Sequence, residues 1–118
     1  MKILADLLTA LVAALHVYFL VLEMFFWDRP RGRKIFGTTP EFAAASKSLA
    51  ANQGLYNGFL AAGLMWALWL GASGVAVRVF FLCCVIIAGV YGGYSVNRRI
   101  LFVQAAPAAL AMGLVLIR

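Results

Sequence analysis

Long runs of apolar residues alternate with short polar interruptions along almost the whole chain. Four of these runs cover residues 3–27, 42–71, 75–96 and 100–117. Each is long enough to cross a membrane, because about 20 apolar residues span a hydrocarbon core roughly 30 Å thick. Lipid offers no partners for backbone groups, and the alternating pattern of a barrel strand is absent, so helices are favoured. The pattern therefore predicts an all-α, integral membrane four-helix bundle forming a single domain over residues 1–118.

The composition is typical of a membrane protein. Of the 118 residues, 65% are hydrophobic and 12% are charged, whereas soluble domains carry about 25% charged residues. The first apolar run follows Lys2 as a signal peptide would, but it is too long, and three further runs follow, so we interpret it as a retained helix. Cys83 and Cys84 are neighbours whose side chains diverge on a helix, and no Cys/His pair has zinc spacing. We expect no metal and no cofactor.

The net charge of +6 is concentrated in two loops. The first loop holds Arg29, Arg31, Arg33 and Lys34, and the third holds Arg98 and Arg99. Short loops rich in Lys and Arg stay in the cytoplasm, which predicts cytoplasmic loops at 28–40 and 97–99. Both termini should then lie on the outer side of the cell membrane. The basic first loop suits contact with the phosphates of membrane lipids, or alternatively a dedicated anionic ligand. No nucleic-acid partner is expected.

Polar residues gather in the cytoplasmic half of the predicted spans. Glu23 lies four residues before Trp27, about 6 Å below the cytoplasmic interface at 1.5 Å per residue. An unpaired charge at such depth costs about 2.5–3.5 kcal/mol on insertion scales, so polar stripes should converge inside the bundle. The convergence predicts a polar cavity open toward the cytoplasm. Its candidate ligand-binding residues are His16, Glu23, Asn52, Gln53, Tyr56, Asn57, Tyr91, Tyr94 and Arg98.

Each of these residues also has a purely structural interpretation. Glu23 can pair with Arg98 or Arg29 as a lock between helices. The carboxamides of the second span can join helices through hydrogen bonds worth about 0.6 kcal/mol each. His16 can be a hydrogen-bonded interior residue, and the two tyrosines of the third span can be ordinary aromatic residues of the membrane interface.

Two glycine pairs with a spacing of four residues indicate close helix packing. Gly54 and Gly58 lie in the second span, and Gly89 and Gly93 lie in the third. Such pairs leave smooth helix faces on which another backbone can approach closely. The contact is either within one protomer or between protomers of a homo-oligomer, and the sequence leaves both open.

The polar residues occur within blocks that resemble a known family. The chain reads "HVYFLVLEMFFW", then a basic loop ending in "FG", then "AANQGLYNGFLAAGL". These blocks resemble the small four-span membrane proteins catalogued as domain of unknown function 1304, and the resemblance covers essentially the whole chain. It implies a four-helix membrane fold. It brings no established activity, so no catalytic residue can be carried over from it.

The leading functional hypothesis is binding, extending to transport, of a small polar or amphipathic molecule, with Glu23 as the ionisable centre. The second is a membrane-embedded enzyme acting on a lipid-soluble substrate, and the third is a structural or partner-binding subunit. The sequence shows no nucleotide-binding loop and no nucleophile–base motif, which weakens the enzyme hypothesis without deciding it.

Overall fold

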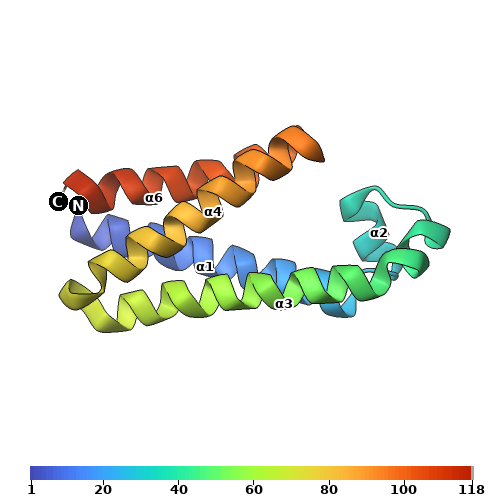
Figure 1. The fold of residues 1–118 in the computed structure, drawn as a ribbon, viewed down its shortest axis with the longest axis horizontal. Coiled ribbons are helices and arrows are strands. Elements are labelled where there is room, and N and C mark those ends of the chain that lie inside the picture. Colours follow the sequence, from blue (N-terminus) through green and yellow to red (C-terminus); the bar gives the residue numbers. More distant parts are fainter. Residues whose placement is uncertain (118) are drawn as a thin grey trace. The chain divides into compact units, whose positions relative to one another are not determined.

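The computed structural model describes residues 1–117, and this part of the chain is helical with no strand. The longer helices are α1 (Lys2–Phe25), α3 (Pro40–Leu70), α4 (Val75–Ser95) and α6 (Ala106–Ile117) (Figure 1). The shorter ones are α2 (Pro30–Phe36), η1 (Gly71–Gly74), α5 (Arg98–Ile100) and η2 (Leu101–Ala105). The predicted all-α class is confirmed, and so is the presence of four helices.

Three continuous helical stretches are long and apolar enough to cross a membrane. They are Lys2–Phe25, Pro40–Ser95 and Arg98–Ile117. The middle stretch holds both α3 and α4, which follow one another through η1. The chain also divides into two compact units, one comprising Met1–Ala14 together with the residues from Leu60 onward, and the other comprising Leu15–Phe59.

The first unit has a core to which α1, α3, α4 and α6 all contribute. Small residues dominate this core, so the helices can approach one another closely, as is usual in membrane bundles. In this unit α1 begins and α6 ends at the same end (Figure 1). The core residues are Ala5, Val12, Ala13, Ala61, Leu64, Leu82, Val85, Ala108, Ala111 and Val115.

Within the first unit, α4 packs tightly against the start of the last helical stretch. A Cβ atom added at Gly89 would lie 2.6 Å from the backbone nitrogen of Ala105, and one added at Gly93 would lie 2.8 Å from Leu101 Cβ. The facing segment η2 is a π-helical turn that ends two residues before Pro107. Because proline lacks an N–H and its ring crowds the carbonyl of residue i−4, a widened turn accommodates it.

The second unit contains α2, which the sequence analysis treated as part of a loop. Pro30 occupies the first turn of α2, where its missing N–H costs nothing, and Gly37 ends the helix with a φ of 69°. That left-handed conformation is the usual glycine ending of a helix. Gly32 is buried against the carbonyl group of Phe26, where a side chain would have no room. The segment has only seven residues, too few for a hydrophobic period to reveal it.

Candidate functional site

Glu23 and Asn57 form a polar contact between α1 and α3 in the second unit. The Glu23 side chain lies in a stretch able to span the membrane, and the residue is only 4% exposed. Asn57 Nδ2 donates a hydrogen bond of 2.5 Å to Glu23 Oε1. The carboxyl group therefore has a defined orientation and a neutral partner.

Two glycines of α3 allow this contact to form. A Cβ atom at Gly54 would lie 2.9 Å from Met24 Cγ and 3.0 Å from Glu23 Cβ, and one at Gly58 would lie 2.6 Å from Leu20 Cδ1. The small-residue face of α3 thus lies directly against α1 of the same chain. Because the backbones approach closely, the short Asn57 side chain can reach the carboxyl group.

Glu23 has no cationic partner within its unit. The one ion pair among residues 15–59 joins Lys47 to Asp28. Arg29, which the sequence offered as a partner for Glu23, instead places its guanidinium 5.9 Å from the centre of the Phe26 ring. A carboxyl group buried in a membrane-spanning helix is costly when its charge is unpaired, so such a group is typically functional.

The other predicted site residues of the second unit differ in their surroundings. His16 is fully buried, and its ring centre lies 5.3 Å from that of Phe19 in an edge-on arrangement. Asn52, Gln53 and Tyr56 have exposed side chains on α3. The structure thus brings Asn57 to Glu23, while the other three predicted site residues of α3 remain accessible.

The remaining predicted site residues belong to the first unit. Tyr91 and Tyr94 are exposed on α4 and border a shallow apolar hollow with Ile86, Ile87 and Val90. Arg98 is exposed in α5. Convergence of these three residues with Glu23 on one cavity stays a prediction.

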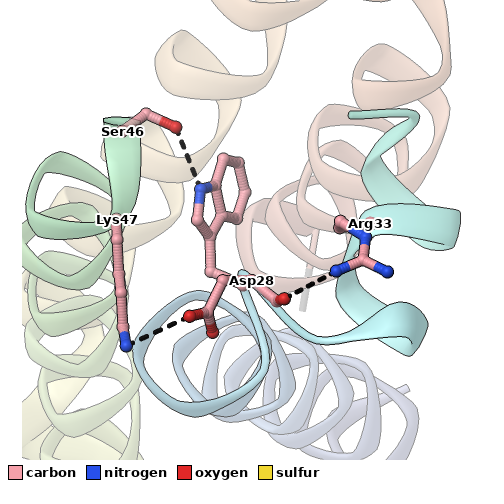
Figure 2. Close-up of polar contacts among 5 residues, drawn as sticks. Asp28, Arg33, Ser46 and Lys47 are labelled. Atoms are coloured by element: carbon pink, nitrogen blue, oxygen red, sulfur yellow. Dashed lines mark hydrogen bonds and ion pairs between the residues drawn. The ribbon is translucent and has the colours of Figure 1, made fainter. Parts of the chain in front are cut away.

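A second polar group, which the sequence analysis did not identify, joins the end of α1 to α2 and α3. The Trp27 indole N–H donates to Ser46 Oγ across 3.0 Å, and Lys47 Nζ lies 3.2 Å from Asp28 Oδ2. Arg33 Nη1 donates to the Asp28 carbonyl oxygen across 2.9 Å (Figure 2). The hydrogen bond from Lys47 holds the pKa of Asp28 below its ordinary value. These contacts fix the chain where it leaves α1.

A third polar group, also missed, is the partly buried ion pair of the first unit. Arg78 on α4 places Nη1 2.8 Å from Asp6 Oδ1 on α1. The sequence analysis assigned no role to Arg78. Opposite charges near the start of the first and third spans were the available signal. Among residues 1–117, no group of three or more His, Cys, Asp or Glu side chains is placed to hold a metal ion.

The helices, their apolar composition and the buried carboxyl group define an all-α integral membrane protein with polar contacts between its helices. The chain belongs to the family described as "Protein of unknown function (DUF1304)", whose sequence model matches residues 10–116. This confirms the family resemblance found in the sequence. The chain is 30% identical over 114 residues to "Uncharacterized protein YpaA" of Lactococcus lactis subsp. lactis (strain IL1403), covering 95% of this chain and 96% of that protein. No solved structure matches the chain.

Proposed function

We propose that this protein binds a small polar or amphipathic molecule within the membrane and carries it across. Glu23 is the ionisable group of the proposed site, and a cationic or hydrogen-bond-donating part of the ligand meets its carboxyl group. Asn57 orients that carboxyl group. The accessible side chains of Asn52, Gln53 and Tyr56 supply further polar contacts on the cytoplasmic side.

The observation that carries this proposal is a buried carboxyl group whose hydrogen-bond partner is a neutral amide. A structural lock would be expected to pair the carboxylate with a cation, since the alternative is an uncompensated charge. Three basic residues of the same unit are instead directed to other partners, Lys47 and Arg33 to Asp28 and Arg29 to the Phe26 ring. The negative charge of Glu23 is thus left for a ligand or a proton.

We propose that the site lies within the cell membrane and opens toward the cytoplasm. The basic residues of α2 and its flanks, and those at Arg98 and Arg99, support a cytoplasmic position for both of these segments. The chain then starts and ends outside. This orientation places Glu23 within two turns of the cytoplasmic surface, because it lies two residues before the end of α1.

Transport by purified protein in liposomes tests the proposal. Choline serves as a small polar cation and ethidium as an amphipathic one, and uptake is followed with and without an imposed pH gradient. We expect the wild-type protein to accelerate uptake of at least one probe and the pH gradient to change its rate. Glu23→Gln keeps an oxygen that accepts the Asn57 hydrogen bond but removes the titrating charge, so uptake and its pH response should be lost.

Glu41→Gln is the matched control, because it removes an exposed carboxyl group at the start of α3. It should transport as the wild type does. The proposal is wrong for cationic ligands if wild-type liposomes take up neither probe faster than protein-free liposomes. The role of Glu23 is wrong if Glu23→Gln retains pH-dependent uptake.

A further inference from the structure

Helix α2 has one face that is held against the end of α1. Gly32 packs on the backbone of Phe26, and Arg33 donates to the Asp28 carbonyl oxygen. One turn further along the helix, the Phe36 ring lies 4.8 Å from the Trp27 ring, centre to centre. Contacts from three positions on one side of a two-turn helix fix its rotation about its own axis.

The opposite face of α2 is exposed and basic. Arg31, Lys34 and Ile35 lie three and four residues apart, so they share one side of the helix, and all three are exposed. Neither cation makes an ion pair with any residue among 1–117. Asp28, the acidic residue nearest in the chain, is already engaged by Lys47. The two outward cations therefore remain free to bind an anion.

The place of α2 in the chain determines which anion it meets. It begins five residues after α1, a helix able to cross a membrane, and Trp27 stands at the junction. Tryptophan is enriched at the level of the lipid headgroups. The exposed apolar side chain of Ile35 shares the outer face with the two cations. An apolar side chain beside two cations matches the boundary between acyl chains and phosphates.

We propose that the outer face of α2 binds the phosphate groups of anionic phospholipids, with Arg31 and Lys34 as the contacting cations and Ile35 in the acyl boundary. All three residues of this face are exposed, so a free phosphate ion would find only partial enclosure there. A lipid phosphate is held at the same depth by its acyl chains, which supply the remaining binding energy. This proposal does not depend on the transport function.

Selectivity for spin-labelled lipids tests the proposal in the intact protein. The protein is reconstituted in phosphatidylcholine membranes, and electron paramagnetic resonance compares the immobilised fractions of spin-labelled phosphatidylglycerol and phosphatidylcholine. We expect the wild type to retain phosphatidylglycerol preferentially, and Arg31→Gln/Lys34→Gln to lose most of this preference. A basic residue near an anionic surface changes association by roughly fivefold. High salt should also weaken the preference of the wild type for phosphatidylglycerol.

Lys2→Gln/Arg99→Gln is the matched control, because it removes the same net charge from two exposed residues elsewhere in the chain. It should keep the preference, and both double variants should melt at the wild-type temperature in detergent. Equal loss in the two double variants, or no preference in the wild type, would overturn the proposal. Displacement of the labelled lipid by millimolar inorganic phosphate would also overturn it, and would instead indicate a site for soluble anions.

Discussion

Arg78 on α4 is buried to 2% exposure and directs Nη1 to Asp6 Oδ1 on α1, 2.8 Å away. The Asp6 side chain is 39% exposed, so the pair has one buried cation and one partly accessible carboxylate. Arg78 Nε is also buried, with no hydrogen-bond partner among residues 1–117. The cation therefore depends on a single carboxylate, although the pair joins two helices that are far apart in sequence.

Asp6→Asn is expected to lower the free energy of unfolding by about 1–3 kcal/mol, because it leaves Arg78 buried without its counter-charge. The cost is below that of a fully buried pair, since Asp6 is partly accessible. Asp6→Asn/Arg78→Met should recover much of the loss, because no charge then remains to be compensated. Reversible unfolding in mixed micelles measures both variants. A single variant as stable as the wild type would show that the pair contributes nothing.

The helical class was predictable because it depends on the composition of long segments, and the family was predictable because it depends on a specific sequence block. Four apolar runs with few charges leave no alternative to helices, and the "NQGLYNGFLA" block is specific enough to identify the family. Pairings between distant residues were harder to predict. The link between Asp6 and Arg78 spans 72 positions, and no local pattern in the chain specifies it.

The candidate site was only partly predictable for the same reason. The sequence predicted that Asn52, Gln53, Tyr56 and Asn57 line one cavity, but it did not determine which of them meets α1. The structure shows that the glycine face meets α1 and that Asn57, at its border, reaches Glu23. Helix rotation depends on tertiary packing, which a single sequence does not contain. Helix α2 was not predicted because it has only seven residues, between the start signal at Pro30 and the end signal at Gly37.

Alanine substitution of individual glycines should destabilise the protein according to what the new methyl group meets. Among Gly54, Gly58 and Gly89, substitution of Gly89 should cost most, about 2–3 kcal/mol, because its Cβ would contact backbone and Cβ atoms of Ala105, which do not yield easily. Gly54→Ala should follow, and Gly58→Ala should cost about 1 kcal/mol, since a flexible Leu20 side chain can move. Thermal unfolding in detergent ranks the variants.

Gly113 supplies the control for this series. An added Cβ there meets no atom within 4 Å, so Gly113→Ala should be neutral or stabilise α6 by up to about 1 kcal/mol through helix propensity. If all the glycine variants melted alike, the close approaches between helices would not limit stability.

The Asp28–Lys47 ion pair should give the protein an acid-dependent component of stability. Because the pKa of Asp28 is lowered by the Lys47 hydrogen bond, its contribution is present above the ordinary pKa of an aspartate, about 4. It is lost as pH falls through the lowered pKa, when the carboxylate becomes protonated. Lys47→Gln should therefore melt closer to the wild type at strongly acidic pH than at neutral pH. A melting difference that stays constant across this range would contradict the assignment.

The proposed topology predicts which membrane face admits a water-soluble reagent. In a Cys83→Ala/Cys84→Ala background, Lys34→Cys should react with an impermeant maleimide in inside-out vesicles and be protected in right-side-out vesicles. Lys2→Cys should show the reverse. Both positions are exposed, so a lack of reaction would report the membrane barrier rather than burial in the protein. Reaction of Lys34→Cys in right-side-out vesicles alone would reverse the proposed orientation.

The Glu23–Asn57 contact can be removed as a whole to separate stability from function. Asn57→Leu alone leaves the buried carboxyl group without its donor and should lower the free energy of unfolding by about 1–3 kcal/mol. Glu23→Leu/Asn57→Leu removes both polar groups together, and replacing a buried polar pair by apolar side chains is often neutral or stabilising. The double variant should therefore fold and melt close to the wild type.

The same double variant should fail to take up choline or ethidium, because the ionisable group of the proposed site is gone. A contact that serves only to join α1 and α3 predicts the opposite, since a stable apolar replacement would leave uptake unchanged. Melting in detergent and uptake in liposomes, measured on the same preparations, distinguish the two roles. A double variant that melts like the wild type and still transports would show that Glu23 and Asn57 serve only to hold α1 and α3 together.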